Sequence, residues 1–244
     1  MPFAVASQIF TKPMQIDSKH ALDNVIWQAL TTRQAHFAER SGEAARFLHD
    51  VTSLTAFEEP SASGYASLAA LVGTGGTAAL FLDEKYEPRT GWTVVAEAPL
   101  MQMICENPND AAPSSSDHLI ELGPPDSHDM LELTALTKPG PFGNRTHELG
   151  FYAGIRVDGR LIAMAGERLK VPGHTEVSAV CTHPDQTGKG YARVLMMEIM
   201  RSIRERGETP FLHVRQDNTR AIELYKRLGF RERKVLHLAV LRNQ

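Results

Sequence analysis

The feature that most constrains the fold is the segment THPDQTGKGYARVLM at residues 182–196. It follows TEVSAVCT, a run at 175–182 typical of a buried strand, and it ends with apolar residues at helical spacing. Two glycines, Gly188 and Gly190, join the expected strand to the expected helix. A glycine turn that opens a helix directs several unpaired backbone N–H groups and the helix dipole at one point. The segment therefore predicts an anion site, where the glycines let a phosphate approach the backbone.

Two familiar phosphate motifs are excluded. No Gly-Lys-Ser or Gly-Lys-Thr follows a first glycine at the P-loop distance, and the dinucleotide fingerprint needs a third glycine. A Gly-x-Gly pair alone is equally typical of an ordinary turn. The choice between an anion site and an ordinary turn therefore depends on the surrounding sequence.

Composition limits the functions that a chain of this kind can have. Its 244 residues are 42% hydrophobic, enough for one sizeable domain or two small ones that share a core. A net charge of -3 and a pI near 6.4 argue against general binding to nucleic acid or to anionic membranes. Any basic site must then be local.

The two cysteines, Cys105 and Cys181, are too few for a disulfide framework in a chain of this length, which favours a reducing compartment. The first residues lack a basic region of the kind that opens a signal peptide. No apolar run approaches the ~20 residues that cross a bilayer. We expect a cytoplasmic protein without a membrane partner.

The best candidate for a domain boundary is ENPNDAAPSSSD at 106–117, which has almost nothing to bury. The pattern predicts two regions, 1–110 and 118–244. In the second region, apolar periodicity and turn residues predict these elements: strand 118–122, helix 126–138, strands 150–157 and 160–170 around the turn Asp158-Gly159, strand 175–182, a helix from 188 to 207, strand 211–215, a helix from 217 to 229, and strand 235–241.

The first region is less regular. The pattern predicts a helix over 22–49 and strands at 77–84 and 91–99. This order faintly parallels the second region, although no glycine turn follows Cys105. The region is either a degenerate internal duplication or an unrelated α/β unit.

Two motifs resemble those of the GNAT superfamily of N-acetyltransferases. AVCTHPDQTGKGYA resembles motif A, with Thr187, Gly190 and Ala192 at its three key positions, although the family usually has Arg or Gln at the first. HVRQDNTRAIELYKRLGF at 213–230 resembles motif B almost throughout. The resemblance covers roughly 118–244 and is closest to the C-terminal domains of glycine N-acyltransferases. It implies a mixed α/β fold with a central twisted sheet flanked by helices, preceded by a smaller α/β region that could be a degenerate half-GNAT unit.

The same resemblance implies where acetyl-CoA binds. The pantetheine arm would lie beside the strand before the glycine turn, and the pyrophosphate would rest on the turn. Lys189 and Arg193 are equally well explained as solvated charges, and Asn218 as a helix cap. The residues implied to bind acetyl-CoA are Val180, Cys181, Thr182, Thr187, Gly188, Lys189, Gly190, Tyr191, Ala192, Arg193 and Asn218.

Three residues are candidates for catalysis. An amine is mostly protonated at neutral pH, so a base or a water chain must remove its proton. Glu176 is the first candidate because histone-type relatives carry a base four residues before the position of Val180, and His213 is the second. Tyr225 lies seven residues after Asn218, the interval at which the family places the tyrosine that protonates the CoA thiolate.

The sequence thus predicts an acetyl-CoA-dependent N-acetyltransferase in which a primary amine of a small molecule, amino acid or peptide attacks directly in a ternary complex. The alternative is an acyl-CoA-binding or sensor protein without turnover, and transfer of a longer acyl group is a third reading. No metal is expected, since the ten histidines are scattered along the chain. The acceptor stays open, and a homodimer is compatible with the sequence.

Overall fold

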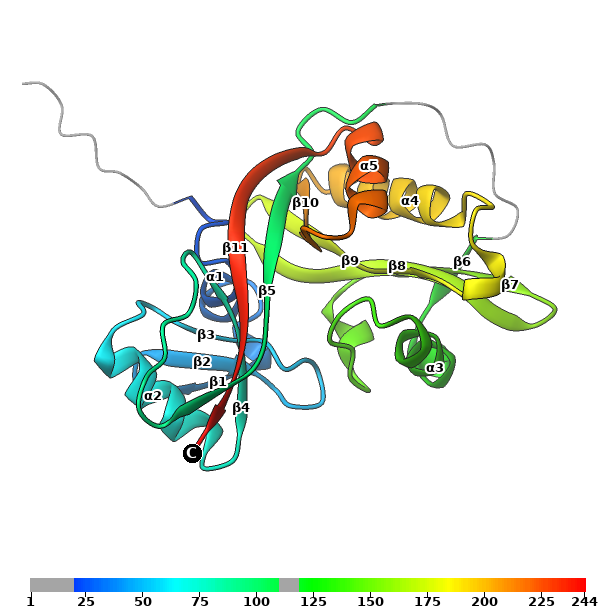
Figure 1. Cartoon of the computed structure of the whole chain (residues 1–244). Coiled ribbons are helices and arrows are strands. Elements are labelled where there is room, and N and C mark those ends of the chain that lie inside the picture. Colours follow the sequence, from blue (N-terminus) through cyan, green and yellow to red (C-terminus); the bar gives the residue numbers. More distant parts are fainter. Residues whose placement is uncertain (1–19, 110–118) are drawn as a thin grey trace, which may run out of the picture.

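The computed structural model describes residues 20–109 and 119–244. Within them lies a twisted eight-stranded mixed sheet with helices on both faces (Figure 1), which confirms the predicted fold class. The strand order is β4-β11-β5-β10-β9-β8-β7-β6. Their bounds are β4 Thr77–Leu82, β11 Arg231–Asn243, β5 Trp92–Ile104, β10 Thr209–Arg215, β9 His174–Thr182, β8 Arg160–Val171, β7 Tyr152–Val157 and β6 Leu119–Leu122. Residues 110–118 lie outside the described residues. They include positions 110–117 of the expected boundary and residue 118 of the expected strand.

Strands β6 to β9 form an antiparallel meander. The turn between β7 and β8 holds Asp158 at φ 49° and Gly159 at φ 80°. Two successive positive φ angles match the right-handed twist of a hairpin, which is why Asp-Gly predicts this turn correctly. Side chains alternate between two apolar layers: Ala153 and Ile155 of β7 face the core beneath α4, while Tyr152 faces the core around α3.

Helix α4 (Tyr191–Glu205) connects β9 to β10 and covers one face of the sheet together with α5 (Thr219–Arg227), as Figure 1 shows. Helix α3 (Ser127–Thr137) covers the opposite face of β8 and β9. The buried residues of α4 are Leu195, Met196, Ile199, Met200 and Ile203. They recur at helical spacing and hold the helix on the sheet.

The prediction of one helix over 22–49 is wrong. Only α1 (Val25–Thr31) is α-helical there, followed by a 3₁₀ turn and a hairpin of β1 (Ala38–Ser41) and β2 (Ala44–Phe47). Gly42 turns the hairpin at φ 51°, a left-handed conformation that favours glycine. The apolar residues of this segment suit a helix face and a hairpin equally, and pairing with β3 (Thr55–Phe57) decides for the hairpin.

The two regions of the chain share the main sheet. After α2 (Ala62–Val72), strand β4 enters this sheet and pairs with β11 from the far end of the chain. Strand β5 is longer than predicted, because it continues through residues 100–104, and it lies between β11 and β10. Each region therefore contributes a strand between strands of the other (Figure 1).

Candidate functional site

Strands β9 and β10 separate near their middle. Their parallel ladder joins Thr209–Phe211 to His174–Glu176, and within the described residues it ends there. The register of β9 against β8 also shifts between Met164 and Gly166, and Ala179 opposite this shift lies at φ 52°. A non-glycine residue in the left-handed region is costly, and such strain is enriched at functional sites. Beyond Glu176, β9 is therefore joined to β8 and no longer to β10 by strand pairing.

The glycine turn lies at the end of β9, before α4. Gly188 and Gly190 have φ angles of 82° and 84°, and a Cβ on either would meet no described atom within 4 Å. The backbone conformation, rather than a lack of space, therefore requires glycine here. Gly190 is the N-cap of α4, whose first-turn amides have no acceptor within the helix. These amides and the dipole of this 15-residue helix create the predicted positive potential.

Side chains around the turn brace it. The Thr187 hydroxyl donates to the Pro184 carbonyl oxygen at 3.1 Å, so the residue that departs from the family pattern closes the preceding 3₁₀ turn. The Lys189 ammonium donates to Gln186 Oε1 at 2.6 Å. Lys189 is exposed and Arg193 is half-buried at the start of α4.

The other predicted cofactor residues lie on β9, α4 and α5. Val180 and Thr182 of β9 are half-buried, and Cys181 is buried. Burial raises the pKa of the Cys181 thiol to about 11, so it is protonated at neutral pH. Tyr191 and Ala192 form the first turn of α4. Asn218 caps α5, since its Oδ1 accepts a hydrogen bond from the Ala221 amide at 3.2 Å.

Tyr225 lies on the buried face of α5, against the core beneath α4. Its side chain is close to the Phe230 ring, with centroids 6.0 Å apart. Burial raises the pKa of Tyr225 to about 12, so the hydroxyl is a proton donor throughout the physiological range.

Glu176 lies fully buried at the point where β9 and β10 separate. Arg168 of β8 donates two hydrogen bonds to its carboxylate, Nε to Oε2 at 2.8 Å and a terminal nitrogen to Oε1 at 2.6 Å. Burial alone would raise the pKa of Glu176, but the charge and hydrogen bonds of Arg168, with a smaller contribution from His213, lower it to about 2. Glu176 is therefore ionised at neutral pH and has little affinity for a proton.

His213 of β10 faces Glu176 and is nearly buried. Its Nδ1 lies 2.7 Å from Glu176 Oε1, and its Nε2 lies 3.0 Å from Gln102 Nε2. Gln102 uses its own oxygen to accept from Arg233 at 2.7 Å, so its amide nitrogen must donate to the imidazole. The hydrogen-bond network thereby assigns the proton to Nδ1, which donates to Glu176, and leaves Nε2 with the lone pair.

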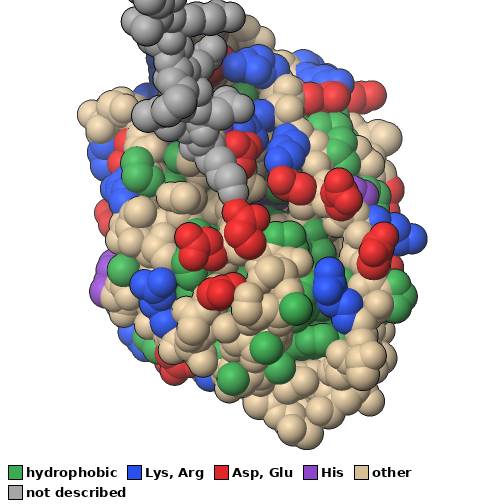
Figure 2. All heavy atoms as spheres, turned by 90° about the vertical axis from the view of Figure 1, so that its left-hand side faces the viewer, with side chains coloured by type: hydrophobic (Ala, Val, Ile, Leu, Met, Phe, Trp, Pro, Cys, Tyr) green, Lys and Arg blue, Asp and Glu red, His purple; other side chains and the backbone are tan. Residues whose placement is uncertain are grey.

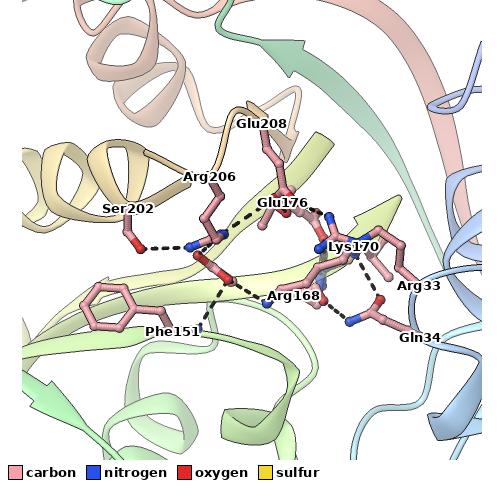
Figure 3. A network of polar contacts seen from close by, with 12 residues as sticks. Arg33, Gln34, Phe151, Arg168, Lys170, Glu176, Ser202, Arg206 and Glu208 are labelled. Atoms are coloured by element: carbon pink, nitrogen blue, oxygen red, sulfur yellow. Dashed lines mark hydrogen bonds and ion pairs between the residues drawn. The ribbon is translucent and has the colours of Figure 1, made fainter. Parts of the chain in front are cut away.

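The N-terminal region holds this cluster from the other side. Gln34 Nε2 donates to the Arg168 carbonyl oxygen at 2.7 Å, and its Oε1 accepts from the Lys170 amide at 3.0 Å (Figure 3). Gln34 thus pairs with the backbone of β8 as a neighbouring strand would. The Phe81 ring of β4 packs on His213 with centroids 4.8 Å apart.

A second buried carboxylate, Glu167, lies next to Arg168 and has a different set of partners. Arg206 donates to Glu167 Oε1 at 2.6 Å, and Lys170 lies 2.9 Å from its Oε2 (Figure 3). Arg206 also donates to the Ser202 hydroxyl at 2.9 Å. These contacts tie the end of α4 to β8, so Glu167 has a structural role beside the cluster.

The structure brings the predicted residues Glu176 and His213 into contact and adds partners that the sequence analysis missed. The sequence contains a signal that could have identified Arg168, because Glu167-Arg168 interrupts an apolar strand and a buried charge needs a partner. The sequence contains no such signal for Gln102 and Gln34, since their contacts depend on long-range pairing of the two regions.

Ligand atoms of His128, Asp129 and Glu132 lie within 4.8 Å of one another on α3. Arg156 contacts Asp129 at 2.6 Å and already neutralises part of this cluster. His128 and Glu132 are exposed, as solvated charges on a helix commonly are. We therefore assign no metal site here.

Comparison with known proteins decides the family. A GNAT-family protein from Novosphingobium aromaticivorans has a solved structure that is 35% identical, with a TM-score of 0.85, over 92% of this chain and 99% of that one. The chain belongs to the GNAT family. In addition, residues 149–238 match the family of FR47-like proteins. A search of curated proteins gives no match.

More distant GNAT structures share the fold alone. A GCN5-related N-acetyltransferase from Kribbella flavida has 17% identity and a TM-score of 0.58, over 88% of this chain and 92% of that one. A GCN5-related N-acetyltransferase-like protein from Streptococcus suis has 14% identity and a TM-score of 0.52, over 93% and 94%. Their similarity extends across both regions of the chain, so the N-terminal elements belong to the shared architecture.

Membership of the GNAT family makes this protein an acyltransferase that takes its acyl group from an acyl-CoA. The first-turn amides of α4 have no acceptor within the helix, and the β9–β10 ladder ends at Glu176 and Phe211. No helix among the described residues is long and apolar enough to cross a membrane.

Proposed function

We propose that the protein is an acetyl-CoA-dependent N-acetyltransferase that acetylates a primary amine of a small molecule, amino acid or peptide. The observation that supports this most strongly is the end of the β9–β10 ladder at Glu176 and Phe211, on the strand that leads into the glycine turn. An acyl-CoA whose phosphates rest on that turn can extend its pantetheine arm along β9 toward Glu176 and His213.

We propose these roles for the cofactor residues. The amides of residues 188–193 and the Lys189 and Arg193 cations bind the pyrophosphate, and Thr187 holds the turn in place. The backbone of Val180, Cys181 and Thr182 pairs with the pantetheine amides. Asn218 caps α5 and orients it beside the same arm.

His213 is the group that takes the proton from the acceptor. Glu176 comes first in the sequence analysis, but a carboxylate with a pKa near 2 and two hydrogen bonds from Arg168 is a weak base. His213 offers a lone pair on Nε2 once the Gln102 amide moves away, and Glu176 stabilises the imidazolium that forms. Glu176 is thus a positioning residue.

The chemical step then balances as follows. The neutral amine nitrogen attacks the thioester carbonyl carbon, a C–N bond forms, and the C–S bond breaks when the tetrahedral intermediate collapses. The amine proton goes to His213. The departing thiolate takes a proton from the Tyr225 hydroxyl, which the pKa of about 12 keeps protonated until that moment.

The two regions have different tasks in this proposal. Residues 118–244 carry the acyl-CoA site, and residues 1–110 contribute Gln102 and Phe81 next to His213 and so form part of the acceptor side. The resemblance of residues 118–244 to the C-terminal domains of glycine N-acyltransferases leaves the acceptor open among small molecules, amino acids and peptides.

Calorimetric titration tests the donor. The purified protein, freed of co-purified cofactor, is titrated with acetyl-CoA, CoA and a long-chain acyl-CoA. Binding that favours acetyl-CoA, followed by thiol release with a panel of amines, would support the proposal. Preference for the long-chain donor would replace acetyl by a longer acyl group, and binding without thiol release would favour a sensor.

A further inference from the structure

Gln102 of β5 lies fully buried beside His213, and both ends of its amide have partners that fix its orientation. The amide nitrogen donates to the Leu22 carbonyl oxygen at 3.0 Å and lies 3.0 Å from His213 Nε2. The amide oxygen accepts from Arg233 of β11 at 2.7 Å. A carbonyl oxygen only accepts and a guanidinium only donates, so turning the amide over would set oxygen against oxygen and nitrogen against nitrogen. Gln102 therefore presents an N–H, and not an oxygen, to the imidazole.

A further contact holds the guanidinium that fixes Gln102. Arg233 also donates to Asp23 at 2.6 Å, and Asp23 directly follows Leu22 in the chain. Burial would raise the pKa of Asp23, but the hydrogen bond and the charge of Arg233 lower it, so this carboxylate is ionised at neutral pH. Figure 2 views the molecule from the N-terminal side and shows basic and acidic side chains next to one another on that face. One short segment before α1 thus supplies both the carbonyl that takes the amide nitrogen and the carboxylate that holds Arg233.

His213 receives opposite influences on its two ring nitrogens. Glu176 is ionised and lies 2.7 Å from Nδ1, so its charge favours a proton there and favours an imidazolium over a neutral ring. The Gln102 N–H faces Nε2, where a second proton would meet the amide hydrogen at a nitrogen–nitrogen distance of 3.0 Å. Because the amide cannot turn over, this contact is compatible only with an unprotonated Nε2.

The other neighbours of His213 are aromatic rings and guanidinium groups. Phe81 of β4 and Phe211 of β10 lie against the imidazole, with ring centroids 4.8 and 5.7 Å from its own. Arg168 of β8 faces the imidazole across the carboxylate just described, and Arg233 faces it across the amide. Both cations oppose a positive charge on the ring, whereas the carboxylate favours one.

We propose that Gln102 is a positioning residue that keeps His213 neutral, with the proton on Nδ1 and the lone pair on Nε2, beside the ionised Glu176. The inference rests on the proposed function, in which His213 takes the proton of the acceptor amine, because an imidazolium cannot accept a proton. An incoming amine presents an N–H to Nε2 as the Gln102 amide does, so it can replace the amide without changing the state of the ring. The N-terminal region thereby determines the protonation of a base that lies in the C-terminal region.

Nitrogen-15 NMR of the full chain, labelled at its histidines, tests the ring state without turnover. The signals of His213 are identified by their loss in His213→Gln. In the wild type at pH 7 we expect Nδ1 to be protonated and Nε2 to be unprotonated. A ring protonated on both nitrogens, or on Nε2 alone, would overturn the proposal.

Gln102→Glu tests the role of the amide, because a carboxylate of the same size accepts hydrogen bonds but cannot donate them. With a carboxylate on each side, His213 should be protonated on both nitrogens at pH 7. Gln102→Met, which removes the N–H without adding a charge, should change the ring in the same direction and replaces Gln102→Glu if that variant does not fold. Gln216→Glu makes the same substitution at a partly exposed position directly after β10 and should leave the ring neutral. A neutral ring in both Gln102 variants, or an equal change in Gln216→Glu, would contradict the inference.

Thiol release separates this inference from the proposed function. In Gln102→Glu, kcat should fall at least about a hundredfold, the lower end of the contribution of a general base, with KM for acetyl-CoA unchanged and a loss that diminishes as the pH rises. An unchanged kcat together with a doubly protonated ring would refute the role of Gln102 in the reaction. Failure of the proposed function would appear instead as absent thiol release in the wild type, with the NMR results for the ring intact.

Discussion

Replacing Glu176 by Gln tests the buried cluster. The substitution keeps the shape of the side chain but removes the charge that Arg168 faces inside the protein, where only 7% of Arg168 is exposed. Breaking a buried ion pair on one side costs ~3–5 kcal/mol, mostly because the remaining charge stays buried without its partner. We expect Glu176→Gln to lower the free energy of unfolding by this amount at neutral pH.

The pKa of Glu176 also predicts how the loss of unfolding free energy in Glu176→Gln changes with pH. The folded-state pKa of Glu176 is about 2, against an ordinary value of 4.5. A depressed pKa contributes stability that is fully present above the ordinary value and is lost as the pH falls toward the folded-state value. The shift of ~2.5 units corresponds to ~3 kcal/mol, so the stability difference between wild type and Glu176→Gln should shrink by about that much between pH 5 and pH 2.

Urea unfolding followed by circular dichroism at several pH values measures this difference. Glu205→Gln is the matched control, because Glu205 forms an exposed ion pair with Arg201 that should be worth ~0–1 kcal/mol. The reasoning would be refuted if Glu176→Gln cost less than ~1 kcal/mol at pH 7. A difference that stayed constant across the acid range would refute the assignment of the low pKa to Glu176.

Three further changes test the site and its support. Gly190→Ala forces a left-handed φ of 84° on alanine, which costs ~1–2 kcal/mol and should weaken acetyl-CoA binding in calorimetry about tenfold. The control is Gly159→Ala, which is strained in the same way at φ 80° in a hairpin and should leave binding unchanged. Tyr225→Phe keeps the buried ring but removes the proton donor, so kcat for thiol release should fall about a hundredfold with little change in KM for acetyl-CoA. Tyr86→Phe, the control, should leave kcat unaltered. Gln34→Leu leaves two backbone groups of β8 without partners and should lower the urea-unfolding free energy by ~1–3 kcal/mol; an unchanged midpoint would contradict this.

The C-terminal elements could be predicted because their signals are local. Asp158-Gly159 specifies a hairpin turn by backbone conformation, and Gly188 and Gly190 mark the turn before α4 for the same reason. The spacing of apolar residues in α4 then identifies its buried face. In each case a few adjacent residues contain the whole physical argument, and the structure agrees with it.

The N-terminal elements could not be predicted in this way. The segment that forms β1 and β2 has apolar residues that suit a helix face, and its conformation is decided by pairing with β3. The partners of His213 could not be predicted for the same reason, since Gln102 reaches His213 only because β5 lies beside β10. The sequence analysis found Glu176 and His213 as separate candidates, and their contact could not be derived before the sheet order was known.

Because β4, β11, β5 and β10 interleave, the main sheet can be completed only after the last strand of the chain, β11, is in place. Strand β4 has no ladder partner until β11 arrives, since Thr77 pairs with Arg242 and Leu82 with His237. Contacts so distant in sequence carry a large loop-closure cost before they return any stability, so folding should be slow, and a nascent chain would expose β4 to other strands. Once β11 has inserted, neither half can open without taking a strand from the other, which should make unfolding one cooperative transition instead of two.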